Sequence, residues 1–354
     1  TLLKTFRIQS PRLLIMSILT RLYYNIKAAI VLSFLAMTLS PLVPTMGIVY
    51  ILVRPFSKVT YLKFASFIQM SWLSVEVFLV EDVCGIKMRV TGDLPSREPA
   101  LCISNHLTHD YVMIYSLGYR MGTLAHTRAI IKNSIRYTPF LGPAIWMCYW
   151  PFVSRDFKKD IKNLKSLFSL YRDAKMPAQI WIFPEGTRLT PSKLRSSQEY
   201  AAAKGYPVWK NVMLPKYRGF CTALDSMKET FRLVNDYTIQ FEGWNGVPGL
   251  WQMLSSDSSK PHTVHVHIKR HQIADVPEDE EGRHQWLIAR FNEKEELLEQ
   301  FKTDKRFPGQ EITRKHAVKD IIVHPIVFGI ASFFLCQTGV RLVSAAVAML
   351  SGNQ

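Results

Sequence analysis

The run from Ala28 to Val53 constrains the fold of this chain most, because none of its 26 residues carries a charge. Lys27 and Arg54 bound the run, and a straight helix of this length would cross the roughly 30 Å hydrocarbon core of a bilayer. Pro41 and Pro44 lie near its middle, where proline interrupts or kinks a helix. The sequence is therefore compatible with one kinked span or with a re-entrant hairpin.

Basic residues flank this run on both sides, for example Arg21 before it and Lys58 after it. The positive-inside rule consequently assigns no orientation, and the symmetry favours a hairpin with both ends in the cytosol. A cleaved signal peptide is not expected, because the run is longer than a signal-peptide core and no small-residue cleavage site follows it.

Two further segments have membrane character. The run from Ile321 to Val340 follows a basic stretch and predicts a C-terminal anchor, with a buried core helix as the alternative. Between residues 61 and 80, Lys63, Gln69 and Glu76 interrupt the apolar pattern. That pattern predicts an amphipathic helix lying on the membrane or on the core.

The chain between the apolar runs alternates short strand patterns with helical ones. Helices are predicted from about His109 to Tyr119 and over residues 157–174, and the acidic run Glu278 to Glu281 is interpreted as a solvated loop. The interleaving predicts an α/β fold with a mixed, mostly parallel sheet and flanking helices. The predicted strands are Ile86–Val90, Ala100–Ile103, Pro151–Val153, Gln179–Phe183 and Thr263–Ile268. We expect an N-terminal membrane part over 1–84, the α/β domain over 85–310 and a C-terminal membrane segment over 311–354.

The formal charge of +16 favours anionic partners: nucleic acid, anionic lipid or phosphorylated ligands. No zinc-finger spacing, RNA-binding string or lysine block is present, which argues against nucleic acid. The histidines between residues 262 and 271 have no carboxylate or cysteine close by in sequence, so no metal is expected. The five cysteines are scattered without CxxC spacing and are expected to be free, buried thiols.

Two short strings carry candidate chemistry. Residues 105–110 read NHLTHD, which places His106 four residues before Asp110; on a helix both side chains would share one face. A histidine oriented by a carboxylate is a typical general base. Residues 183–188 read FPEGTR, a strand that enters a glycine turn carrying Glu185 and Arg188. An arginine fork suits a phosphate because it binds two oxygens.

In this order the two strings resemble motifs I and III of the PlsC-like glycerolipid acyltransferases. The string from Trp150 to Arg155 is similar to motif II, and the string from Val212 to Arg218 is similar to motif IV. The resemblance covers roughly residues 85–310. It extends to the branch that holds the 1-acyl-sn-glycerol-3-phosphate acyltransferases, the epsilon type above all, and the lysocardiolipin acyltransferases.

This resemblance implies a membrane acyltransferase that moves an acyl chain from acyl-CoA to lysophosphatidic acid, giving phosphatidic acid. His106 would be the general base and Asp110 would orient it. Acyl-CoA would be a co-substrate, with no cofactor and no metal; the partners would be the lysophospholipid and membrane lipid. The endoplasmic reticulum membrane is the expected location, with the mitochondrial outer membrane or nuclear envelope as alternatives. The implied substrate-binding residues are Lys132, Arg155, Glu185, Gly186, Thr187, Arg188 and Pro215.

Two departures from the family pattern leave alternatives open. Three residues separate His106 from Asp110 where the family has four, and Trp150 stands where the family usually has glycine. The departures are compatible with a catalytically silent, lipid-binding relative. The motif residues would equally serve another acceptor, such as lysophosphatidylinositol, lysophosphatidylglycerol or a lysocardiolipin.

Overall fold

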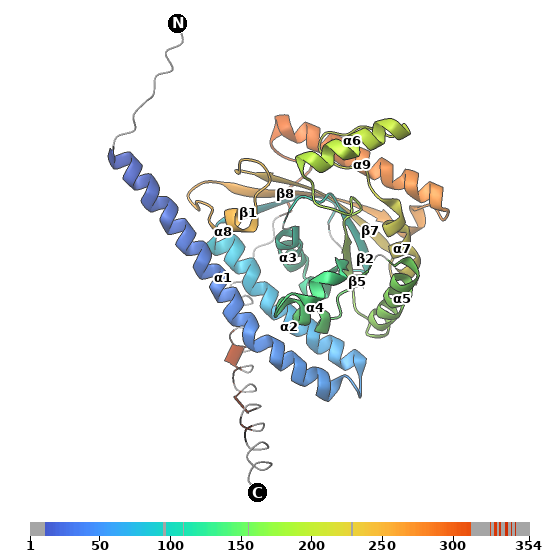
Figure 1. Ribbon diagram of the computed structural model, residues 1–354. Coiled ribbons are helices and arrows are strands. Elements are labelled where there is room, and N and C mark those ends of the chain that lie inside the picture. Colours follow the sequence, from blue (N-terminus) through green and yellow to red (C-terminus); the bar gives the residue numbers. More distant parts are fainter. Residues whose placement is uncertain are drawn as a thin grey trace.

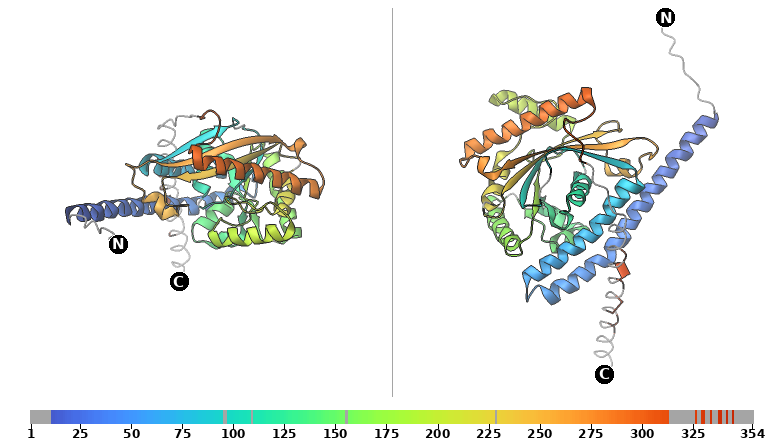
Figure 2. Two further views of the ribbon diagram at one scale, coloured as in Figure 1. Left: turned by 90° about the horizontal axis from the view of Figure 1, so that it is seen from above. Right: turned by 180° about the vertical axis from the view of Figure 1, so that it is seen from behind.

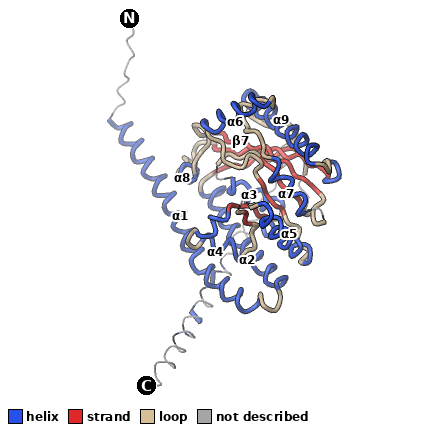
Figure 3. Tube along the Cα trace, turned by 45° about the vertical axis from the view of Figure 1, so that its right-hand side comes forward, coloured by secondary structure: helices blue, strands red, loops and turns tan. Residues whose placement is uncertain are grey.

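The computed structural model (Figure 1) describes residues 11–94, 97–108, 110–154, 156–227, 229–312 and single residues between 326 and 344. A central sheet carries helices on both faces, as predicted, and a long N-terminal helix runs along one side of this domain. Figure 3 shows the strands gathered at the centre with the helices around them.

The N-terminal part is a pair of helices, α1 (Pro11–Val53) and α2 (Lys58–Phe78), which pack against each other. Pro41 and Pro44 lie inside α1, yet the helix continues to Val53. The expectation of a re-entrant hairpin within the apolar run is therefore wrong. The chain turns only after Val53, and the Ser57 hydroxyl caps α2 by accepting from the Thr60 N–H.

The two helices differ in burial. In the described part of the chain, both are long and apolar enough to cross a membrane, but 17% of the α1 window is buried against 61% of the window that contains α2. The first turns of α1 project beyond the domain (Figure 2), with large apolar side chains such as Met16 and Leu19 exposed. Helix α2 lies on the core, which agrees with one of the two placements predicted for residues 61–80.

The main sheet has the strand order β1-β8-β7-β2-β6-β3. β7 and β8 are antiparallel, and all other neighbours are parallel. A separate two-stranded sheet pairs β4 with β5 in parallel. The strands are β1 (Ile86–Gly92), β2 (Ala100–Ser104), β3 (Thr127–Ala129), β4 (Ile131–Lys132), β5 (Phe152–Val153), β6 (Gln179–Ile182), β7 (Leu233–Glu242) and β8 (His262–Gln272).

The remaining helices of the described chain surround this sheet. They are α3 (Asp110–Met121), α4 (Leu141–Met147), α5 (Phe157–Asp173), α6 (Pro191–Lys204), α7 (Tyr217–Met227), α8 (Leu250–Leu254) and α9 (Glu280–Asp304), with short π or 3₁₀ segments at Leu79–Val83, Leu124–His126, Asn133–Tyr137 and Ile273–Asp275. The run Glu278 to Glu281 was expected to be a loop; instead Glu280 and Glu281 form the first turn of α9, where carboxylates complement the helix dipole.

The pleat of the strands divides the core into two parts. Leu101 and Ile180 face a core shared with α5, α7 and α9, whereas Cys102 and Trp181 face a core shared with α2 and α3. Four of the five cysteines lie in the described chain, and all four are free and buried, as predicted. The apolar run from Ile321 to Val340 falls largely outside the described residues, so its anchor role remains a prediction.

Candidate active site

Three loops meet at one edge of the sheet. β2, β6 and β3 are parallel neighbours, so their carboxyl ends lie at the same edge. β2 leads into the His106 loop, β6 leads into the loop from Phe183 to Leu189, and β3 leads towards Lys132. Ligands of open α/β sheets bind at such edges.

Asn105 fixes the start of the first loop. Its side-chain amide donates to the carbonyl of Ile239 over 3.0 Å and accepts from the Ile239 N–H over 2.9 Å. The side chain thus continues the hydrogen bonding between β2 and β7 for one more position, in a site with no solvent exposure. The backbone of His106 consequently leaves the sheet at a fixed position.

His106 and Asp110 are brought together despite their short spacing. His106 Nδ1 lies 2.5 Å from Asp110 Oδ2. Helix α3 begins at Asp110, close to the predicted start at about His109, so His106 precedes the helix and the two residues do not share a helix face.

The remaining surroundings of the imidazole leave one nitrogen available. The ring stacks on Phe183, with 4.2 Å between centroids and 22° between planes. Its side chain is 22% exposed, while that of Asp110 is 2% exposed. The carboxylate of Asp110 favours the tautomer in which Nδ1 carries the proton and donates a hydrogen bond to it. In that neutral tautomer Nε2 carries the lone pair and can act as a base.

Glu185 faces the protein interior. Its side chain is buried, the backbone N–H groups of His106 and Met213 lie close enough to favour its charged form, and Oε2 has no hydrogen-bond partner within the described chain. Burial raises the pKa of Glu185 well above its usual range; the nearby Asp110 carboxylate adds to the rise, and Lys294 opposes it. Glu185 was predicted to bind substrate, but in the structure its side chain is buried beside the backbone of His106 and Met213.

Backbone hydrogen bonds tie the His106 loop, the loop from Phe183 to Leu189 and the segment at Lys216 together. The Leu189 N–H donates to the His106 carbonyl over 2.7 Å, and the Lys216 N–H donates to the Pro184 carbonyl over 2.7 Å. Gly186 turns the second loop with φ +70°, and a Cβ atom there would lie 3.3 Å from the Lys216 side chain. The loop therefore needs glycine for both its conformation and its close approach to Lys216.

Cationic side chains surround the rim of this loop cluster. Arg188 is exposed, Lys216 crosses Gly186, and Lys193 Nζ donates to the Thr187 hydroxyl over 2.5 Å. None of these three cations forms an ion pair within the described chain. Lys193 and Lys216 were not predicted as site residues; Lys193 lies in the first turn of α6, a position that follows from the Thr190-Pro191 helix start.

The other predicted site residues lie in different surroundings. Lys132 is exposed on β4, where its backbone pairs with Val153 of β5. Pro215 is buried. Arg155 lies outside the described residues.

Trp150, the departure from the family glycine, packs inward. Its indole N–H donates to Gln69 Oε1 over 2.8 Å, and its ring meets the edge of Tyr115. The tryptophan therefore links α2, α3 and the β5 segment within the core.

The histidines of β8 have separate partners. His265 contacts Glu242, His267 contacts the hydroxyl of Thr91, and His262 contacts the carbonyl of Lys260. Across the described residues, no group of three or more His, Cys, Asp or Glu side chains is arranged to hold a metal ion.

Two family models match the chain. Residues 86–220 match the family described as "Acyltransferase", and residues 257–326 match "Acyltransferase C-terminus". The first match contains the His106 loop and the loop from Phe183 to Leu189.

Curated relatives and one solved structure are also similar. "1-acyl-sn-glycerol-3-phosphate acyltransferase 2" of Arabidopsis thaliana is 33% identical over 75% of this chain and 69% of its own length. "1-acyl-sn-glycerol-3-phosphate acyltransferase epsilon" of Mus musculus is 29% identical over 74% and 76%, and "Lysocardiolipin acyltransferase 1" of Gallus gallus is 29% identical over 65% and 61%. The crystal structure of the 1-acyl-sn-glycerophosphate acyltransferase PlsC of Thermotoga maritima aligns with a TM-score of 0.45 at 16% identity, covering 80% of this chain and 98% of that chain.

Proposed function

The chain belongs to the acyltransferase family that includes the 1-acyl-sn-glycerol-3-phosphate acyltransferases, and we propose that it moves an acyl chain from acyl-CoA to lysophosphatidic acid, giving phosphatidic acid. The observation that carries this proposal is the His106–Asp110 contact beside a rim of unpaired cations. A base and a phosphate-binding rim are what an acceptor with both a hydroxyl and a phosphate requires.

The proposed reaction proceeds without a covalent enzyme intermediate. His106 Nε2 takes the proton of the acceptor hydroxyl while the hydroxyl oxygen attacks the carbonyl carbon of the thioester. The tetrahedral intermediate then loses the CoA sulfur, the carbon–sulfur bond breaks, and the imidazolium returns the proton to the thiolate. Asp110 holds Nδ1 protonated throughout and stabilises the imidazolium.

Each loop has a proposed role around this step. Arg188, with Lys193 and Lys216, binds the acceptor phosphate. Glu185 is a positioning residue, because it engages the backbone N–H groups of His106 and Met213. Lys132 adds positive charge at the same sheet edge, Pro215 shapes the neighbouring wall, and Arg155 remains a proposed phosphate ligand.

The proposed donor is acyl-CoA, with no further cofactor or metal. The exposed apolar helix α1 supports membrane association of the enzyme. The endoplasmic reticulum membrane is the proposed location; a tagged full-length chain in intact cells would test it. Co-localisation with a mitochondrial or nuclear-envelope marker alone would contradict this location.

The reaction is tested on the purified full chain in detergent. The protein is given acyl-CoA with a panel of lysophosphatidic acid, lysophosphatidylinositol, lysophosphatidylglycerol and lysocardiolipin. Free thiol release is measured, and mass spectrometry identifies the acylated product. We expect thiol release that depends on lysophosphatidic acid. Absence of release across the panel would overturn the proposal.

The panel also addresses the second acceptor class. Similarity to a protein named lysocardiolipin acyltransferase motivates its inclusion. A preference for lysocardiolipin would retain the acyl-transfer chemistry and replace the acceptor. Lipid binding without thiol release, unchanged in His106→Ala, would favour a catalytically silent relative.

A further inference from the structure

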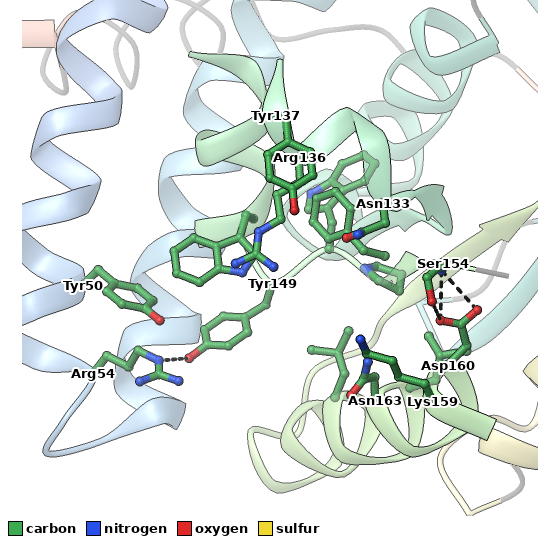
Figure 4. A pocket seen from close by; sticks show the side chains of 16 residues that line it. Tyr50, Arg54, Asn133, Arg136, Tyr137, Tyr149, Ser154, Lys159, Asp160 and Asn163 are labelled. Carbon is green, nitrogen blue, oxygen red and sulfur yellow. Dashed lines mark hydrogen bonds between the residues drawn. The ribbon is translucent and has the colours of Figure 1, made fainter. Parts of the chain in front are cut away.

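A cavity lies beside the motif II string, and Trp150, Pro151, Phe152 and Ser154 of that string line it. It has a volume of about 410 Å³ and lies between the end of α1, helix α4 and helix α5 (Figure 4). Neither His106, Asp110 nor the loop from Phe183 to Leu189 contributes to its described lining. The volume falls in the range of small-molecule sites, roughly 300–1,000 Å³.

Positively charged side chains outnumber negatively charged ones in the described lining of this cavity. Arg54, Arg136 and Lys159 line it, and none of them forms an ion pair within the described chain. The carboxylate among the described lining residues is Asp160, which already accepts from the N–H and the hydroxyl of Ser154. An anion entering the cavity therefore meets three cations and one carboxylate among the described lining residues, and the carboxylate already accepts hydrogen bonds from Ser154.

Aromatic rings hold the two guanidinium groups in place. The Arg54 guanidinium lies 4.8 Å from the centroid of the Tyr50 ring, and its Nε donates to the Tyr149 hydroxyl over 3.0 Å. The Arg136 guanidinium lies 4.8 Å from the centroid of the Trp146 ring. Each guanidinium lies over the face of an aromatic ring, and this contact restricts the side chain and so lowers the entropy cost of binding an anion.

The backbone at Tyr149 is also unusual. This residue has a φ of +57°, in the left-handed region that side chains other than glycine rarely adopt. The Tyr171 hydroxyl donates to the Tyr149 carbonyl, and the Tyr149 ring faces the cavity beside Arg54 (Figure 4). Backbone strain of this kind concentrates at ligand sites. The hydrogen bonds from Tyr171 and Arg54 hold Tyr149 in place in the wall of the cavity.

We propose that this cavity binds a phosphate monoester, with Arg54, Arg136 and Lys159 as its anion contacts. A monoester carries nearly two negative charges at neutral pH, which suits a cavity with several free cations. The proposed function supplies two candidate molecules that carry such a phosphate, and the inference rests on that function to this extent. One is the 3′-phosphate at the nucleotide end of acyl-CoA; the other is the headgroup of phosphatidic acid.

Calorimetric titration of the full chain in detergent tests the proposal. The protein carries Arg188→Ala, so that the proposed acceptor site contributes little to binding. The probes are 3′,5′-ADP for the nucleotide source and dihexanoyl phosphatidic acid for the lipid source. Dihexanoyl phosphatidylcholine, a phosphodiester without net charge, is the control. Binding of 3′,5′-ADP identifies the CoA end, and binding of the short-chain phosphatidic acid identifies the lipid headgroup.

Additional substitutions locate the binding. Arg136→Ala and Lys159→Ala should each raise the Kd of the bound probe about tenfold or more, and Arg136→Lys should lose less. Both side chains are exposed, so melting temperatures should stay near that of the parent. If neither monoester binds, or if binding is indifferent to Arg136 and Lys159, the proposal is overturned. If the chain releases thiol but binds neither probe, the cavity proposal is wrong and the proposed function stands. If it binds a probe but releases no thiol, the proposed function is wrong and the cavity proposal stands.

Discussion

His106 Nδ1 lies 2.5 Å from Oδ2 of Asp110, across a loop that precedes α3. The other oxygen of Asp110 is buried and has no hydrogen-bond partner within the described chain. The carboxylate therefore interacts chiefly with the imidazole, which it holds in one tautomer. The shortened spacing therefore does not separate the two side chains, because they make contact with three residues between them.

Replacing Asp110 with asparagine should impair turnover. The amide keeps the size of the side chain but favours the wrong imidazole tautomer, so kcat should fall about 10²–10⁴-fold. The KM values for both substrates and the melting temperature should change little. Steady-state kinetics with both substrates varied would measure this, and wild-type turnover in Asp110→Asn would show that the carboxylate does not orient the base.

Replacing Glu185 with glutamine should change how stability depends on pH. Burial raises the pKa of Glu185 in the folded protein above its unfolded value of about 4.3. The folded state thus binds more protons above that pH, and the stability of the wild type falls as pH rises towards the folded pKa. The melting temperature of Glu185→Gln minus that of the wild type should therefore increase between pH 5 and pH 8. The exposed Glu199→Gln is the control; an equal difference at all pH values in Glu185→Gln would contradict the account.

Replacing Gly186 with alanine should affect both stability and the acceptor site. Its φ of +70° costs an L-residue about 1–2 kcal/mol, and the new Cβ would press on Lys216. Gly205 has a φ of +71° with open space around it, so Gly205→Ala is a matched control. Both variants should melt at lower temperature, while Gly186→Ala alone should raise the acceptor KM. Equal acceptor KM values in the two variants would show that Gly186 has no role in binding the acceptor.

Replacing Arg188 with alanine should weaken acceptor binding. A lost charge-assisted bond to phosphate is worth about 1.5–3 kcal/mol, so the acceptor KM should rise about ten- to a hundredfold with little change for acyl-CoA. Arg188→Lys should recover part of the loss, because an ammonium cannot form the two-pronged contact. Arg195→Ala on the exposed surface of α6 is the control. A rise in the acyl-CoA KM instead would place Arg188 at the donor phosphates.

The strands that sequence patterns predicted are those whose apolar residues show strand spacing without interruption. β7 was not predicted, because Asn235 and Asp236 interrupt its apolar pattern. Both are buried in the fold, where Asn235 donates to Gln179 and Asp236 pairs with Lys294 of α9. Such tertiary partners satisfy polar groups that local pattern rules assign to the surface.

The sequence identified most of the residues proposed for the site, but it did not predict how they are arranged. The spacing of His106 and Asp110 suggested a shared helix face, yet a loop brings them together. Glu185 faces inward because the second loop packs on the first, a relationship between segments that are far apart in sequence. Lys193 lies beside Thr187 because α6 starts at Thr190 and Pro191, a local helix-start pattern from which its position could have been predicted.

Thiol release by His106→Ala and His106→Gln, compared with the wild type, tests the central claim most directly. Each protein is purified in detergent and given saturating acyl-CoA and lysophosphatidic acid, after melting temperatures have shown that all three are folded. Because His106 is the proposed base, we predict acceptor-dependent release by the wild type and a loss of at least about a hundredfold in both variants. Release at the wild-type rate by either variant would contradict the assignment of His106 as the base for acyl transfer.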